Sequence, residues 1–236
     1  MNRKLKQALS DAFYAPSPVR KAAFLKQHRR RELDRWELIA LQVRYIQWWV
    51  WLLSLVLTGF ILVSVTWTEE PATWCIAALT PFLALLVITE NGRAQLYQME
   101  ELELACRMSR QSVILARMVA LGVFHLIQFG LLTPLLVAWG KVETIQAGVY
   151  LLTPYLLTAA LGLELNRRIR NREGLLACGA AAAAISVLGA LVENSRPALY
   201  QPENLIWWGM ALAVAIVAVA IEFTLNIKKM GELQWT

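Results

Sequence analysis

Two polar residues inside an apolar segment are the first candidates for chemistry in this chain. His125 and Gln128 stand three residues apart within residues 113–139, so a helix there places both side chains on one face. In lipid, such a pair turns toward a neighbouring helix or a cavity. It serves either as a substrate contact or proton relay, or as an interhelical hydrogen bond worth about 1 kcal/mol. Of the two, we expect the hydrogen bond.

A second candidate is the polar stretch at residues 97–111, which lies between two long apolar segments. Met99, Leu102 and Cys106 recur at spacings of three and four, so a helix presents them on one face with charge elsewhere. A short amphipathic helix between two spans lies at the bilayer surface or docks on a soluble partner. The remaining alternative is a solvated helix without a partner.

Three Thr-Pro pairs interrupt the apolar segments, at Pro81, Pro134 and Pro154. Proline removes one helical hydrogen bond and clashes with the preceding turn, so it kinks a helix. These positions are either hinges of a bundle that opens and closes, or ordinary prolines of membrane helices.

The residue constellations of common enzymes are absent from the sequence. It contains no H-E-x-x-H zinc motif, no paired-cysteine zinc site, no G-x-S-x-G elbow and no Walker A motif. His28 and His125 lie in different settings, which argues against a histidine metal centre. We therefore expect no catalytic residue, metal or cofactor on this chain, and any ATP hydrolysis on another chain.

Composition indicates an all-α membrane protein. The 236 residues are 58% hydrophobic, above the roughly 45–50% of globular proteins, and only 17% are charged. Several apolar runs reach about 20 residues, the length that crosses a bilayer core. Cys75, Cys106 and Cys178 fall at different expected depths, so we expect no disulfide.

The elements that position these residues are six expected spans and one helix before them. The domains we predict are a basic tail with an amphipathic helix (1–45), a membrane domain (46–227) and a short tail (228–236). On the helix at 31–45 an apolar face suits the membrane interface. That face consists of Leu33, Trp36, Ala40 and Val43. The spans are 46–66, 72–90, 113–139, 146–164, 174–192 and 205–227. Small residues at 179–184 predict a close-packing surface, within the chain or between two copies.

Charge sets the expected topology. With six spans, 21 of the 23 Lys and Arg residues fall on one side, and only Lys141 and Arg196 fall on the other. The positive-inside rule then places both termini in the cytoplasm. The basic cluster at residues 28–31 fits this topology signal, and without a binding module around it we expect no nucleic-acid partner.

The order of elements resembles the permease subunits of type-2 ABC exporters. Those proteins have a cytoplasmic interfacial helix, six spans and an acidic helical loop between spans two and three. The glutamates at 100, 101 and 103, the pair Ser109-Arg110 and the basic residue Arg117 match the family's loop. The family's Gly-Thr before the second Glu, its Pro before Ser-Arg and its long loop between spans five and six are missing here.

The resemblance implies a partner and a mechanism. The loop would be a coupling helix in a groove of a separate ATPase subunit, which would bind ATP and Mg. Its contact residues would be Met99, Glu100, Glu101, Leu102, Glu103, Arg107, Ser109 and Arg110. The helix at 31–45 would be a connecting helix. Two permease copies, identical or similar, would form the transport unit in the plasma membrane and move a peptide, lipid or drug-like amphiphile.

A different class of function remains open. The long basic tail also suits a membrane regulatory or scaffold protein that holds a cytoplasmic factor. The six-span layout and the acidic loop favour the exporter over this alternative.

Overall fold

The chain is described by a computed structural model that covers residues 35–67, 73–97, 110–138, 143–169, 171–195 and 197–232. All of these belong to the compact unit Arg35–Thr236. The elements are α3 (Arg35–Tyr45), α4 (Trp48–Trp67), α5 (Thr73–Leu96), α7 (Arg110–Ala138), α8 (Thr144–Arg168), α9 (Asn171–Ser195), η1 (Pro197–Tyr200), η2 (Pro202–Asn204) and α10 (Leu205–Glu232). Every regular element in the described ranges is helical, which confirms the all-α prediction for that part of the chain.

A helix covers nearly all of the described part of each range predicted as a span, but several helices run past the apolar stretch. The helix expected to end at 90 continues to Leu96, and the one expected to end at 164 continues to Arg168. Charged residues follow the apolar stretch in both helices, and pairs along the helix help to stabilise these turns. Arg93 lies 2.9 Å from Glu90, and Arg168 lies 2.6 Å from Glu164.

Four of the described helices are long and apolar enough to cross a membrane, namely Ser112–Ala138, Thr144–Arg168, Arg172–Val192 and Pro202–Asn226. A fifth candidate joins Trp36–Tyr45 to Trp48–Ser64, two helices that meet at an angle of 83°. These apolar helices indicate a protein embedded in a membrane.

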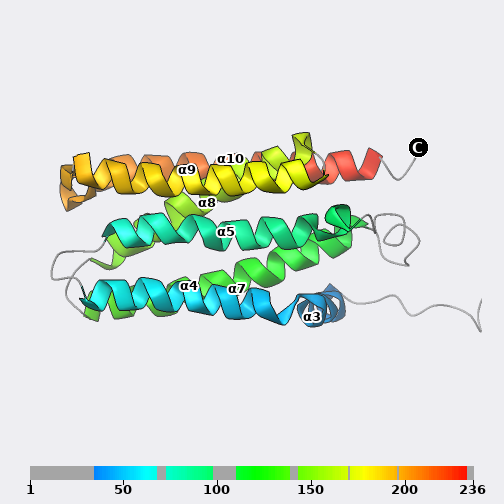
Figure 1. Ribbon diagram of the computed structural model, residues 1–236, viewed down its shortest axis with the longest axis horizontal. Coiled ribbons are helices and arrows are strands. Elements are labelled where there is room, and N and C mark those ends of the chain that lie inside the picture. The colour runs from blue at the N-terminus through cyan, green and yellow to red at the C-terminus, as the bar shows by residue number, and fades with distance from the viewer. Residues whose placement is uncertain are drawn as a thin grey trace, which may run out of the picture. The chain divides into compact units, whose positions relative to one another are not determined.

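Consecutive long helices alternate in direction (Figure 1). The start of α4, the end of α5, the start of α7 and the end of α8 therefore lie at one end, which we call the basic end. Its basic residues include Arg44, Arg93, Arg117, Arg167, Arg168 and Arg172. Helix α5 contacts α4, α7, α8 and α9, and α7 contacts α3, α4, α5, α8 and α10.

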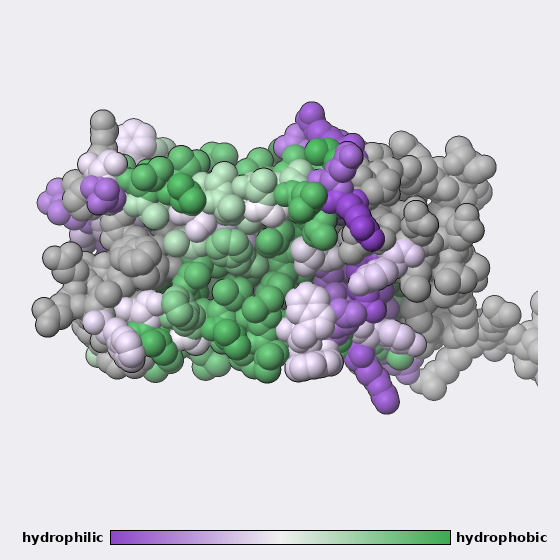
Figure 2. Space-filling model, in the orientation of Figure 1, coloured by the Kyte–Doolittle hydropathy of each residue, from purple (hydrophilic) through white to green (hydrophobic). Residues whose placement is uncertain are grey.

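The outer faces of the helices are apolar. Leu52 on α4, Leu126 on α7, Leu176 on α9 and Val214 on α10 are all exposed. Figure 2 shows apolar residues as a band across the visible face, with hydrophilic residues toward its ends. Soluble monomers rarely expose an apolar surface of this extent, whereas lipid covers one without cost.

Helices α5 and α8 pack tightly at one glycine. A Cβ added at Gly162 would meet the side chain of Ile88, so only glycine fits there without a shift. Within the small-residue run of α9, Ala182 is buried whereas Ala183 is exposed, and Gly179 has open space beside it. The close-packing surface therefore uses one face of α9, with Cys178 and Ala182, rather than the whole run.

Candidate functional site

Several residues predicted to act lie outside the described part of the chain. They are Leu33, Met99, Glu100, Glu101, Leu102, Glu103, Arg107 and Ser109. Arg110 is the first residue of α7.

Helix α3 turns its predicted apolar face outward. Trp36 is 76% exposed, and Ala40 and Val43 are exposed beside it. The inward face is instead made by Ile39, Gln42 and, just past the helix end, Ile46. An exposed tryptophan on a helix bent away from an apolar helix suits the headgroup region of a bilayer.

The contact between α3 and α7 depends on a residue that the pattern did not single out. The Arg117 Nε donates a hydrogen bond of 3.0 Å to Oε1 of Gln42, which is buried. Arg117 stands in the second turn of α7, shortly after residues 98–109 of the predicted loop. Ile39, Gln42 and Ile46 recur at spacings of three and four, which indicates one helix face. A search for apolar residues alone misses this face, because Gln42 is polar.

His125 and Gln128 join three helices in the middle of the bundle. His125 Nδ1 lies 3.1 Å from the hydroxyl of Tyr155 on α8, and Gln128 Oε1 accepts a hydrogen bond of 2.8 Å from Ser54 on α4. Both α7 residues are buried, at 0% and 5% exposure. The structure thus brings together two residues predicted as a pair with two partners that the sequence left unmarked.

Aromatic rings surround this polar pair. The Trp51 and Phe124 rings meet edge to face at 4.6 Å, and Tyr155 meets the rings of both His125 and Phe129 in the same manner. Edge-to-face pairs each add about 0.5–1.5 kcal/mol beyond the area they bury. The pair therefore lies in a well-packed, apolar shell.

Four buried side chains retain polar atoms without a partner in the described part of the chain. These atoms are Thr80 Oγ1, both amide atoms of Asn91, His125 Nε2 and Gln128 Nε2. All four residues lie on α5 or α7. An unpaired buried polar group costs about 1–3 kcal/mol, so their concentration on two helices calls for an explanation.

The predicted hinge prolines lie within continuous helices. Pro81 is in α5, Pro134 in α7 and Pro154 in α8. The hydroxyl of Thr133 bonds to the Phe129 carbonyl at 2.8 Å, and that of Thr153 to the Val149 carbonyl at 2.7 Å. The carbonyls that Pro134 and Pro154 leave without a helical N–H donor belong to Gly130 and Tyr150, so each of these hydroxyls bonds to the carbonyl one residue earlier. The Thr80 hydroxyl, which precedes Pro81, makes no such bond in the described residues.

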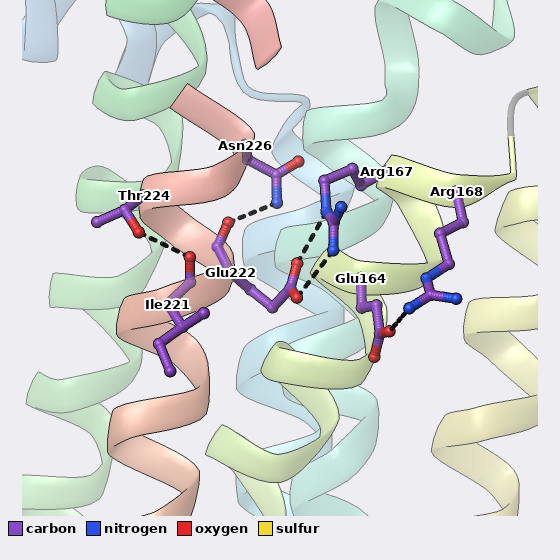
Figure 3. Close-up of polar contacts among 7 residues, drawn as sticks. All are labelled: Glu164, Arg167, Arg168, Ile221, Glu222, Thr224 and Asn226. Atoms are coloured by element: carbon purple, nitrogen blue, oxygen red, sulfur yellow. Dashed lines mark hydrogen bonds and ion pairs between the residues drawn. The ribbon is translucent and has the colours of Figure 1, made fainter. Parts of the chain in front are cut away.

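A charged cluster ties α8 to α10 at the basic end. Figure 3 shows Arg167 reaching across to both carboxylate oxygens of Glu222, at 3.1 and 3.0 Å. The carboxylate is largely buried, and the fork-to-fork geometry fixes its orientation. The adjacent pair of Arg168 and Glu164 stays within α8 and is more exposed.

A second junction joins α8 to α10 at the opposite end. The carbonyl oxygen of Tyr200 in η1 accepts hydrogen bonds from Gln146 at 2.8 Å and from the Tyr150 hydroxyl at 2.9 Å. The rings of Tyr150, Tyr200 and Trp208 pack together at about 5 Å. The short helix η1 is thereby anchored, and α8 and α10 are joined near both ends.

Among the described residues, no group of three His, Cys, Asp or Glu side chains lies close enough together to hold a metal ion. No protein-family model matches the chain, and neither a curated protein nor a solved structure matches it.

Proposed function

We propose that this chain is the transmembrane subunit of an ATP-driven ABC exporter, with ATP and Mg bound by a separate ATPase subunit. In this proposal six helices cross the plasma membrane, both termini are cytoplasmic and a second permease copy completes the transport unit. Its cargo is a peptide, lipid or drug-like amphiphile.

The contact between α3 and α7 is the observation that supports this proposal most. Helix α3 lies at 83° to the helix that follows it and packs on α7 through Gln42 and Arg117. The acidic loop leads directly into α7. Displacement of that loop by an ATPase would therefore move α7 and α3 together, and α3 would pass the movement to α4.

A membrane regulatory or scaffold protein is the second candidate. The basic cluster at residues 28–31 favours it, because such a segment binds acidic partners or lipid headgroups. A regulatory or scaffold function gives no reason for an acidic loop that directly precedes α7, the helix that contacts α3.

Affinity purification from crosslinked native membranes distinguishes the two. We expect a chain with a Walker A motif to be retained in stoichiometric amount. Charge reversal of Glu100, Glu101 and Glu103 to Lys should release that chain while the variant remains in the membrane. The matched control reverses two exposed glutamates at the opposite end, Glu143 and Glu203, and should retain it.

Recovery of a cytoplasmic factor without an ATPase would favour the regulatory protein. Full retention of the ATPase by the triple variant would remove the loop from the contact.

A further inference from the structure

The buried polar atoms without partners follow two regular stripes. On α5, Thr80, Ala84, Val87 and Asn91 recur at spacings of four, three and four, and all are buried. On α7, Leu121, His125, Gln128 and Leu132 recur at the same spacings and are also buried. Each set therefore forms the inward face of its helix.

Apolar members of both stripes belong to one core. Ala84 and Val87 belong to the same buried cluster as Leu121 and Leu132, and α5 contacts α7 directly. An α-helix rises about 1.5 Å per residue. Thr80 therefore lies about 24 Å along the axis from the end of α5, and His125 lies about 22 Å from the start of α7. Asn91 lies closer to the basic end. The unpaired atoms thus extend from near that end to the middle of the bundle.

Packing alone does not explain these side chains. An apolar residue of similar size at Thr80 or Asn91 would avoid a cost of about 1–3 kcal/mol, whereas at His125 or Gln128 it would also remove the hydrogen bond to Tyr155 or Ser54. Ser54 bonds to the Oε1 atom of Gln128, and Tyr155 bonds to the Nδ1 atom of His125. The Nε2 atom of each of these two residues stays buried and unpaired. Groups of this kind find partners when the helices that bury them separate.

We propose that the stripes of α5 and α7 line the route of the transported molecule, and that this molecule presents uncharged hydrogen-bonding groups. Amides and hydroxyls are the matching chemistry, because the unpaired groups are a hydroxyl, two carboxamides and an imidazole, while the neighbouring charged residues Arg117 and Glu90 are paired with Gln42 and Arg93. The inference rests on the proposed transport function and specifies where its route lies.

Cysteine reactivity tests the route. The thiolate reacts with methanethiosulfonates, and a thiol ionises only where water reaches it, so modification reports a hydrated position. The variants Thr80→Cys and Gln128→Cys are made in a chain whose three native cysteines are replaced. Open membrane sheets that retain the native partners are supplied with ATP and Mg, so that reagents reach both sides.

Three controls isolate the stripes. Val50→Cys on α4 and Ala182→Cys on α9 are equally buried but lie outside them, and Leu126→Cys faces outward on α7. We expect the two stripe positions to be modified and the three controls to stay unmodified. Thr80→Cys is the smaller change in side-chain size, so it decides the outcome if Gln128→Cys does not accumulate. Unreactive stripe cysteines, or equal modification of Val50→Cys and Ala182→Cys, would overturn the proposal.

The charge of the reagent tests the chemical class. Neutral hydroxyethyl methanethiosulfonate should modify the stripe cysteines at least about tenfold faster than the anionic sulfonatoethyl reagent, because charge is costly in such a setting. Glu143→Cys, which is exposed, corrects for the intrinsic reactivity of the two reagents. Equal corrected rates would reject an uncharged cargo.

The outcome is independent of the ATPase experiment. If the stripe cysteines are modified but no ATPase is associated, the hydrated route is supported and the exporter function is rejected. If an ATPase is associated but the stripe cysteines are not modified, the exporter function is supported and this route is rejected.

Discussion

At the scale of single residues, glycine positions distinguish tight from loose packing on one helix. Gly162 and Gly148 both lie in α8, but a Cβ at Gly162 would meet Ile88 whereas one at Gly148 meets nothing within 4 Å. Their burial gives the same contrast, since Gly162 is buried and Gly148 is partly exposed. The same substitution at the two sites should therefore have opposite effects.

We expect Gly162→Ala to lower the free energy of unfolding by about 1 kcal/mol or more through overpacking. Gly148→Ala should be neutral or should raise it by up to about 1 kcal/mol, because alanine favours helix. Denaturant titration in detergent micelles measures both. Ile88→Val shortens the opposing side chain and should recover part of the Gly162→Ala loss. Equal effects of the two alanines would contradict the close approach of α5 and α8.

At the scale of elements, α3 is short and depends on its contact with α7. An isolated helix of its 11 residues is marginal in water, so packing must hold it. Gln42 supplies the acceptor for Arg117, and Ile39 packs on the core beside it. The outward residues contribute to lipid contact and not to this junction.

Removal of that acceptor should therefore loosen α3. Gln42→Ala loses a hydrogen bond from a charged donor, worth about 1.5 kcal/mol or more, so α3 amides should exchange hydrogen about tenfold faster. Exchange followed by mass spectrometry in lipid nanodiscs measures this. Arg44→Gln changes an exposed residue of the same helix and should leave exchange unchanged. Unaltered protection in Gln42→Ala would show that the contact does not hold α3.

At the scale of the whole molecule, the charge distribution predicts one orientation in the membrane. The exposed residues Glu143 and Glu203 stand just before α8 and α10, whereas Arg172 is in the first turn of α9. Because consecutive long helices alternate in direction, the two glutamates lie at the opposite end of the bundle from Arg172. In the proposed topology the first two face the outside of the cell and Arg172 faces the cytoplasm.

Single cysteines at these three positions, in a chain without its native cysteines, test the orientation. A membrane-impermeant maleimide added to intact cells should modify Glu143→Cys and Glu203→Cys at once, and Arg172→Cys only after permeabilisation. The reverse pattern would invert the topology. Modification of all three in intact cells would contradict an alternating bundle.

The sequence by itself determined where the helices lie. Apolar runs of about 20 residues predicted six ranges, and a helix covers nearly all of the described part of each. It also singled out His125 and Gln128, because polar residues are rare inside such runs. Their interhelical partners were not predictable, since Tyr155 and Ser54 lie 30 and 74 residues away.

Only the tertiary structure decided which face of each helix turns inward. A helix that is apolar on all sides has no preferred face in its own sequence, so neighbouring helices make the choice through packing. That choice pairs Arg167 with Glu222, 55 residues apart, and Gln42 with Arg117, 75 residues apart. It also leaves Thr80 and Asn91 buried without partners, because whether a polar atom is satisfied depends on what packs against it.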